Sequence, residues 1–415
     1  MNRIPTLRFP EFEGDWIDTR LEHCISALDA GVSVNSEGRP ARQDEQGILK
    51  TSCVTLGSFD QNENKVVNDR LEVKRLKEPV SADTIIISRM NTPALVGANA
   101  FVSGDKENLY LPDRLWAAKI KQGNNPMWVS FLTSHPFTRA KISARATGTS
   151  GSMKNVTKSD IFSLPVNVPK ENEQIKIAKF LGAVDEKIRL LEVRHEKLTL
   201  YKKAMMQKIF SQTIRFKQDD GGDFPEWEVK KLGQIFDRVT RKNTENNKNV
   251  LTISSQLGLI NQIEYFNKSV SAKDVTGYYL VENGEFAYNK SYSKGYPMGA
   301  IKRLNRYDKG VVSTLYICFR TKNEISGRFY EQFFEGGGLI KELHKIAQEG
   351  ARNHGLLNLS VVEFFKDVDI PWMHLEEQQK IADFLSAIDD KIEAVSAQIT
   401  QMQSFKKGLL QQMFV

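Results

Sequence analysis

The chain carries an internal repeat. Residues 173–210, EQIKIAKFLGAVDEKIRLLEVRHEKLTLYKKAMMQKIF, align without a gap with residues 377–414, EQQKIADFLSAIDDKIEAVSAQITQMQSFKKGLLQQMF. About 15 of these 38 positions are identical, more than chance produces in a gapless alignment of this length. The offset is about half of the 415 residues, and both halves open on Phe-Pro-Glu, at 9–11 and 224–226. The repeat predicts two similar halves, each running from this start to a long helix.

Both copies of the repeat have helical periodicity, with apolar residues at alternating spacings of three and four. Neither contains proline, and acids at the start and lysines at the end suit the helix dipole. Each helix should be about 57 Å long. A single apolar stripe on so long a helix requires a partner, and we expect the two copies to pair. The residues predicted to pair them are Ile177, Leu181, Val184, Ile188, Leu191, Leu198, Ile381, Leu385, Ile388, Ile392, Val395 and Ile399.

Polar residues interrupt this stripe at His195, Lys202 and Lys406. They either lie solvated at its edge and set the register or have a catalytic or metal-binding role, and the pattern favours the first reading. Gly182 and Gly408 lie off the stripe, where glycine costs about 1 kcal/mol relative to alanine. They are either tolerated surface positions or places where another subunit approaches closely.

Two bodies of ordinary domain size, about 21–168 and 232–372, complete the halves. Both mix strand and helix signals in a similar order, which predicts an α+β fold. The expected strands are 48–57, 83–88 and 114–121 in the first body and 250–254, 284–290 and 311–320 in the second, and the expected helices are 125–146 and 328–349. The helices are alike and the bodies differ, which indicates one shared scaffolding role and two different recognition roles.

The composition favours folded, soluble domains, with 40% hydrophobic and 26% charged residues. Lys and Arg number 58 against 51 Asp and Glu, a formal charge of +7 that is a mild bias toward polyanionic partners. The three cysteines form no C-x-x-C pair, and no apolar run approaches the ~20 residues that span a bilayer. We therefore expect a cytoplasmic protein with neither a disulfide framework nor a zinc ribbon.

Motifs for catalysis are missing from the sequence. It has no G-x-x-x-x-G-K-[ST] loop for ATP, no G-x-G-x-x-G loop, and no Asn-Pro-Pro-aromatic motif of methylases. His23 beside Cys24 lacks further metal ligands nearby, and Pro112-Asp113 is not followed by the acid-x-lysine of metal nucleases. We therefore expect no catalytic residue, no metal and no cofactor bound by this chain.

Several motifs occur together along the whole chain. They are the Phe-Pro-Glu starts with a following tryptophan, the helix motif EQ-x-K-I-A-x-F-L, the helix ends KKAMMQKIF and KKGLLQQMF, and the strings YNKSYSKGYPMGAIKRL and NHGLLNLSVVEFF. In this combination the chain resembles the specificity subunits of Type I restriction–modification enzymes. The resemblance implies target-recognition domains at 1–168 and 213–372, each reading half of a split DNA site. It implies spacer helices at 169–212 and 373–415, packed antiparallel in a pseudo-two-fold arrangement.

The resemblance also implies partners. These are two methyltransferase subunits, which methylate adenine and hold S-adenosylmethionine, and restriction subunits that cut DNA with ATP and Mg. Two different domains on a fixed helical spacer would contact DNA a set distance apart. A heptad added to the spacer should shift them by about 10 Å, or about three base pairs.

In the first body, two loops have the polar and basic residues that bases and phosphates require. Gly148 and Gly151 would let the second loop approach a backbone closely. A plain flexible loop is the alternative. The candidate DNA-binding residues are Arg89, Asn91, Arg145, Thr147, Thr149, Ser150, Ser152 and Lys154.

The second body offers one basic, hydroxyl and aromatic segment and a second loop at the place that corresponds to 144–155. Arg352 would suit guanine and Asn353 adenine, with a solvated turn as the alternative. The candidates are Lys290, Ser291, Tyr292, Ser293, Lys294, Tyr296, Arg352, Asn353 and His354. A different function, a helical scaffold whose bodies bind proteins, would lack the steep salt dependence of DNA binding.

Overall fold

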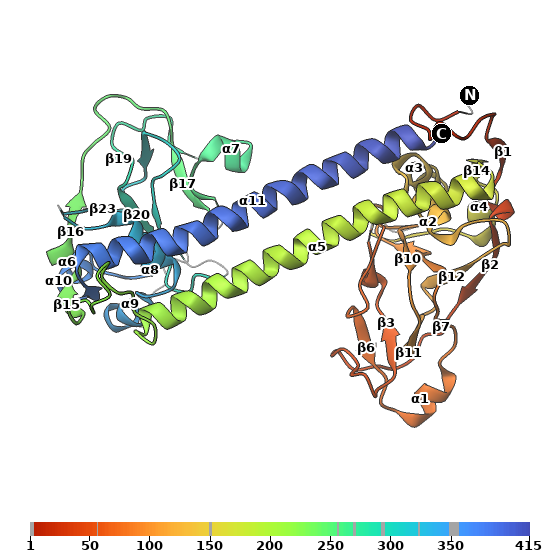
Figure 1. Cartoon of the computed structure of the whole chain (residues 1–415), viewed down its shortest axis with the longest axis horizontal. Helices are drawn as coiled ribbons and strands as arrows, with labels where there is room; N and C mark the ends of the chain where they lie inside the picture. The colour runs from red at the N-terminus through yellow and green to blue at the C-terminus, as the bar shows by residue number, and fades with distance from the viewer. Residues whose placement is uncertain are drawn as a thin grey trace. The chain divides into compact units, whose positions relative to one another are not determined.

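The computed structural model describes residues 4–55, 57–148, 152–254, 257–268, 271–291, 295–322, 324–347 and 357–415 (Figure 1). The chain forms two compact units. Unit 1 is Met1–Glu192 with Ala397–Val415, and unit 2 is Val193–Ser396. Each long helix, α5 (Glu171–Phe210) and α11 (Leu375–Met413), therefore begins in one unit and ends in the other, whereas the four predicted segments kept the helices apart from the bodies.

Unit 1 contains two four-stranded sheets. The first is antiparallel, in the order β10 (Asn99–Val102), β8 (Thr84–Ser88), β12 (Leu115–Ile120), β2 (Ile25–Ala30). The second has the order β6 (Asn64–Val66), β3 (Gly47–Leu49), β11 (Lys106–Tyr110), β7 (Pro79–Val80), and β3 and β11 are parallel. Two-stranded pairs join β1 (Ile17–Arg20) to β14 (Pro165–Val168), β9 (Met90–Asn91) to β13 (Lys154–Asn155), and β4 (Val54–Thr55) to β5 (Ser58–Phe59). Its shorter helices are η1 (Leu21–His23), η2 (Thr51–Cys53), α1 (Arg70–Arg75), α2 (Pro126–Ser134), α3 (Pro136–Arg145) and α4 (Lys158–Phe162).

Unit 2 repeats this plan. Its main sheet has the order β21 (Ala300–Arg303), β20 (Phe286–Asn289), β23 (Ile317–Thr321), β16 (Phe236–Val239). The pairs β17 (Leu251–Ser254) with β18 (Gly258–Asn261) and β19 (Tyr279–Glu282) with β22 (Lys309–Val312) meet through a parallel bridge from Val250 to Val311. β15 (Glu228–Lys231) pairs with β24 (Asp369–Trp372). The helices are α6 (Leu232–Ile235), α7 (Gln262–Phe266), α8 (Gly327–Glu335), α9 (Ile340–Ile346) and α10 (Val361–Lys366).

The strands of the two main sheets correspond one to one. β10, β8, β12 and β2 of unit 1 match β21, β20, β23 and β16 of unit 2 in both order and direction. The parallel bridge of unit 2 stands where β3 meets β11 in unit 1. The predicted α+β fold with an internal repeat is confirmed.

Four of the predicted elements are interrupted. The strand expected at 311–320 is two strands, β22 and β23, joined by a turn at 313–316. The helix expected at 328–349 breaks after α8, where three successive glycines begin at Gly336 and Gly337 has φ +77°. Pro136 divides 125–146 into α2 and α3, since proline fits only the first turn of a helix. Within 48–57, η2 separates β3 from β4.

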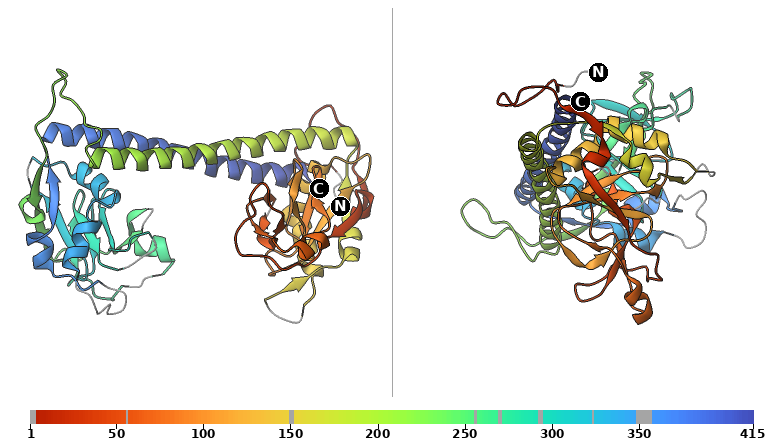
Figure 2. Two further views of the ribbon diagram at one scale, coloured as in Figure 1. Left: turned by 90° about the horizontal axis from the view of Figure 1, so that it is seen from below. Right: turned by 90° about the vertical axis from the view of Figure 1, so that its right-hand side faces the viewer.

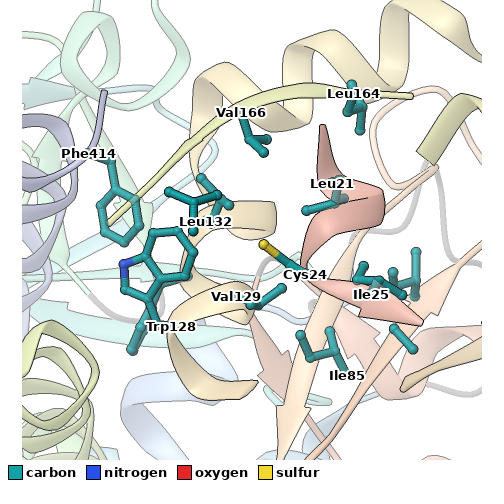
Figure 3. Close-up of a cluster of buried hydrophobic side chains, with 14 of the residues drawn as sticks. Leu21, Cys24, Ile25, Ile85, Trp128, Val129, Leu132, Leu164, Val166 and Phe414 are labelled. Carbon is teal, nitrogen blue, oxygen red and sulfur yellow. The ribbon is translucent and has the colours of Figure 1, made fainter. Parts of the chain in front are cut away.

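The end of each long helix fills the core of a unit. In unit 1, Phe414 follows α11 and stacks on Trp128 at 5.9 Å (Figure 3). It also meets Trp16 edge-on at 6.2 Å. In unit 2, the equivalent Phe210 ends α5 and meets Phe329 and Phe333 edge-on at 6.0 and 5.3 Å. The repeated KK-x-x-x-Q-x-x-F motif is therefore a core motif as well as a helix end.

A buried carboxylate fixes the start of each long helix. Glu173 accepts hydrogen bonds from Arg8 at 2.8 Å and from Trp16 Nε1 at 3.1 Å. Glu377 accepts the same pair of donors, from Arg215 at 3.0 and 3.2 Å and from Trp227 Nε1 at 3.0 Å. The sequence explained these acids by the helix dipole alone, but they also anchor the segment that opens each half.

The glutamine after each carboxylate joins the long helix to a second helix. Gln174 accepts the backbone N–H of Asn125, the N-cap of α2, at 2.9 Å. Gln378 accepts the N–H of Ser326, the N-cap of α8, at 3.0 Å. The repeated Glu-Gln is therefore a structural lock, present once in each unit.

In both units α5 and α11 pair antiparallel. The lysines of the stripe form ion pairs with aspartates of the other helix, Lys406 with Asp185 in unit 1 and Lys202 with Asp389 in unit 2, both at 2.6 Å. The two pairs are equivalent under the repeat. They give the lysines the register-setting role that the sequence favoured.

Most of the predicted pairing residues are buried. Ile177, Leu181, Val184, Ile188, Leu191, Ile381, Leu385, Ile388 and Val395 are buried, and Leu198, Ile392 and Ile399 are half-buried. Many belong to the same apolar clusters as body residues, so the stripe packs on the bodies as well as on the other helix.

The other singled-out helix residues have separate surroundings. His195 is half-buried, and its carbonyl accepts the Thr199 hydroxyl at 2.9 Å. A Cβ on Gly182 would lie 3.0 Å from the Met127 sulfur, whereas Gly408 faces open space. Gly182 thus allows a body residue close to α5, and Gly408 is a surface position.

Candidate nucleic-acid interface

The first candidate loop of unit 1 begins where the inner strand β8 ends. Arg89 follows β8, is half-buried, and holds its guanidinium 5.5 Å from the centre of the Trp116 ring. Its Nε donates to Asn155 Oδ1 at 3.4 Å. Asn91 lies two residues further on, in β9, and its side chain donates to Ser88 Oγ at 3.1 Å. Arg89 is therefore held at the strand end by the second candidate loop.

The two candidate loops of unit 1 form one surface. β9 pairs antiparallel with β13, which sets Asn91 opposite Lys154. Thr147 exchanges backbone hydrogen bonds with Asn155 at 2.8 and 2.9 Å, and both Thr147 and Ser152 are exposed. The segment that carries β13 lies at the end of unit 1 away from α5 (Figure 2, left). Thr149 and Ser150 lie outside the described residues.

Arg145 is held by α4 and by the residue that follows it. Its Nη1 donates to the Asp160 carbonyl at 2.7 Å and to Ser163 Oγ at 3.0 Å. Asp160 belongs to α4, and Ser163 is the C-cap of that helix. The structure therefore gives this guanidinium a local anchoring contact. Among the described residues, the Lys154 Nζ donates only to the Gly148 carbonyl, at 3.5 Å.

Arg139, which the sequence did not single out, shapes the segment after Asn91. It is buried and has no carboxylate partner among the described residues; instead it donates to the carbonyls of Val96 at 2.8 Å and Ala94 at 3.0 Å. Burial lowers the pKa of this guanidinium below its usual value. A buried arginine is an unusual anchor for a loop, and only the fold shows it.

Unit 2 places Lys290 where unit 1 has Arg89. Lys290 directly follows β20, and its carbonyl accepts the N–H of Leu357 at 3.0 Å, as the Arg89 carbonyl accepts the N–H of Val156 at 3.0 Å. Leu357 thus lies at the same strand end in unit 2 as Val156 in unit 1. Arg352, Asn353 and His354 lie outside the described residues.

Of the remaining candidates of unit 2, the structure describes Ser291 and Tyr296. Ser291 follows Lys290 and donates its N–H to Asn289 Oδ1 at 3.0 Å. Tyr296 is half-buried, with its hydroxyl 3.3 Å from both Glu335 Oε2 and Lys302 Nζ. Burial and the Glu335 charge raise the pKa of Tyr296. Tyr292, Ser293 and Lys294 lie outside the described residues.

A turn that the sequence missed lies beside each strand end. In unit 1 it is 112–115, and the Arg89 N–H donates to the carbonyl of Arg114 at 3.1 Å. In unit 2 it is 313–316, and Asn289 Nδ2 donates to the Tyr316 hydroxyl at 3.4 Å. Pro112 and Asp113 are residue types that favour turns, so the sequence did contain a local signal for the first turn. The second turn was hidden inside a predicted strand.

Together these residues give unit 1 a basic and polar rim, made of Arg89, Asn91, Arg114, Thr147 and Lys154. Guanidinium and ammonium groups can bind phosphates, and the amide and hydroxyl groups can bind base edges. A family model of the Type I restriction modification DNA specificity domain matches residues 61–200 and 225–403. The chain belongs to this family. The predicted identity as a Type I specificity subunit is confirmed.

Relatives of this specificity subunit match it along most of its length. The putative specificity subunit of the type I restriction enzyme MjaX from Methanocaldococcus jannaschii is 23% identical over 96% of this chain and 93% of its own. The MjaVIII specificity subunit of the same organism is 27% identical over 62% of each chain. A crystal structure of a Type I S subunit from M. genitalium, 15% identical, covers 99% of each chain with a TM-score of 0.61 and supports the fold.

Further features of the described part of the specificity subunit concern metal ligands, reactive thiols and membrane-spanning helices. Within those residues, no three His, Cys, Asp or Glu side chains are grouped as a metal site would require. Burial raises the pKa values of the Cys24 and Cys318 thiols to about 12, which leaves both as weak nucleophiles at neutral pH. Among the same residues, no helix has the length and apolar content to cross a membrane.

Proposed function

We propose that the two units of this specificity subunit each read one half of a bipartite DNA site. The observation that carries this proposal is the repeated strand end: a basic residue, Arg89 or Lys290, follows the inner strand of equivalent sheets. The same backbone hydrogen bond ties each strand end to a returning loop. The side chains around the two ends differ, so a common scaffold presents two different reading surfaces.

The paired helices fix the gap between the half-sites in this proposal. α5 and α11 each run from one unit into the other, and an ion pair sets their antiparallel register in each unit. A heptad must therefore be inserted in both helices, after 192 and after 396, to keep both registers. The gap should lengthen by about three base pairs while both half-sites stay the same. A heptad in α5 alone is the control and should disrupt one register.

Two methyltransferase subunits dock on the helices in this proposal. Lys187 and the equivalent Lys391 are exposed and form no ion pair with described residues, although both copies of the repeat retain them. Tyr201 and the equivalent Phe405 are aromatic and 48% and 49% exposed. A duplicated exposed aromatic suits two copies of one partner, since large aromatics are enriched at interfaces.

The partners supply the chemistry. The methyltransferase subunits hold S-adenosylmethionine and methylate adenine in the site, and restriction subunits use ATP and Mg to cut DNA. This chain binds no cofactor itself and is not catalytic. Its role is to choose the sequence, which places it in the cytoplasm with its DNA.

Mapping of methylated adenines in cells that carry this chain and its methyltransferase tests the proposal. The expected result is one bipartite motif with a constant gap. In the purified complex, DNA affinity should fall steeply as salt rises from about 50 to 200 mM. A helical scaffold with protein-binding bodies would show neither a methylated motif nor this salt dependence.

A further inference from the structure

The turns at 112–115 and 313–316 occupy the same place in the two units. In each, the N–H of the fourth residue donates to the carbonyl of the first, Leu115 to Pro112 at 3.3 Å and Tyr316 to Ser313 at 3.0 Å. Each turn leads into the strand, β12 or β23, that pairs with the strand preceding the basic residue. The third residue of the turn is therefore directly comparable: it is arginine in unit 1 and leucine in unit 2.

Neither of these two side chains has a structural role within the described residues. Arg114 is exposed, and its side chain makes no hydrogen bond or ion pair there; only its carbonyl is used, by Arg89. Leu315 is 60% exposed and belongs to none of the hydrophobic clusters of the described chain. A single exposed leucine is ordinary on a protein surface. Leu315 is of interest because it occupies the same turn position as Arg114.

We infer that this turn position reads a base in both half-sites, a guanine through Arg114 and the methyl group of a thymine through Leu315. The side chain of a leucine has neither a charge nor a donor for a phosphate, so a side-chain contact to phosphate cannot be common to the two turns. Base edges in the major groove suit both: guanine O6 and N7 accept from arginine, and the thymine methyl group packs on apolar side chains. This inference rests on the proposed function.

The neighbouring residues support a base-reading position. Arg114 lies beside Arg89, and Arg89 is itself held by Trp116 and Asn155. A basic residue also precedes the equivalent site in unit 2, where Lys290 follows β20. Phosphate contacts from these strand-end residues would position the backbone, and the turn beside them would reach into the groove.

Arg114→Leu tests the first half of the inference, in the complex of the full chain with its methyltransferase subunits. Preference for guanine at one position of one half-site should fall about 5- to 100-fold, and the other half-site should not change. Arg70→Leu on α1, another exposed arginine of unit 1, is the matched control and should leave both half-sites unchanged. A uniform loss of affinity without a change in base preference would overturn the guanine contact.

Leu315→Ala tests the second half with duplexes in which each thymine of the site is replaced in turn by deoxyuridine. For the wild-type complex, one replacement in the half-site of unit 2 should weaken binding about fourfold, the effect of one buried methyl group. The Leu315→Ala complex should be insensitive to that replacement. Leu200→Ala on α5, 58% exposed, is the control. If wild type and Leu315→Ala respond alike at every thymine, the methyl contact is refuted.

Two outcomes separate the proposed function from the inference about the turn. If the wild-type complex methylates no bipartite motif, the proposed function is wrong. If it methylates one and both turn variants keep the wild-type base preferences, only the inference about the turn is wrong.

Discussion

Units 1 and 2 share their anchoring contacts and differ at their reading surfaces. Glu173 and Glu377 bind the same Arg and Trp donors, and Phe414 and Phe210 fill equivalent core sites. At the strand ends and turns, by contrast, the residues differ. Arg89 and Arg114 of unit 1 correspond to Lys290 and Leu315 of unit 2. The contacts that hold the helices tolerate little change because they are buried. The exposed turns can vary without loss of stability, and specificity can therefore diverge there.

The largest effect should come from the buried carboxylates. Glu377→Ala should destabilise unit 2 by about 4 kcal/mol, because Arg215 and Trp227 lose their shared acceptor. Glu173→Ala should do the same to unit 1. Hydrogen exchange resolved along the chain measures both. Glu186→Ala, which removes an exposed partner of Arg189, is the control with little effect. Unequal losses would show that the two anchors are not equivalent.

The aromatic ends of the helices should rank next. Phe414→Ala should cost about 3 kcal/mol in unit 1, since Phe414 is buried against Trp16 and Trp128. Phe210→Ala should cost less, about 2 kcal/mol in unit 2, because Phe210 is only half-buried. Urea unfolding of the full-length variants gives both values. A larger loss from Phe210→Ala would reverse this ranking of the two cores.

The interhelical ion pairs should have smaller effects. Asp389→Asn should cost about 1 kcal/mol, because Asp389 accepts from Gln332 at 2.8 Å as well as from Lys202. Asp185→Asn should cost about half as much, since Lys406 is its one partner among the described residues. Both losses should shrink in 1 M salt, where the Debye length falls to about 3 Å. Equal losses in both units would remove the role assigned to Gln332.

The smallest effect should be a pH dependence of stability that is found in unit 2 and not in unit 1. Burial raises the pKa of Glu331 in α8, despite Arg303 at 3.7 Å and a hydrogen bond from Asn305; Glu335 and Asp389 raise it further. The folded state therefore holds this proton more tightly, and unit 2 loses stability as pH rises from the unfolded value near 4.3 through the higher folded pKa. Glu331→Gln should stabilise unit 2 by a few tenths of a kcal/mol at pH 7 and less at pH 4. Unit 1 has Ser130 at this position and serves as the internal control. A gain that is larger at pH 4 would contradict the assignment.

The sequence alone predicted the elements that have a local pattern, such as a helical period or a cluster of polar residues. The repeated period of three and four fixed the long helices, and the halves followed from the offset between the copies. Arg89, Asn91 and Lys154 were recognisable as candidates because polar and basic residues cluster in their loops.

Only the tertiary structure decided which of those residues meet. The pairing of β9 with β13 joins two loops that are about 60 residues apart in sequence, and no local signal encodes such a contact. No local signal shows that Arg145 donates to the carbonyl of Asp160 in α4. The turn that carries Leu315 was also missed, because it lies in a run of β-branched residues that predicted one continuous strand. The repeat determined that the chain has two halves. Packing and long-range hydrogen bonds determined where each half presents its side chains.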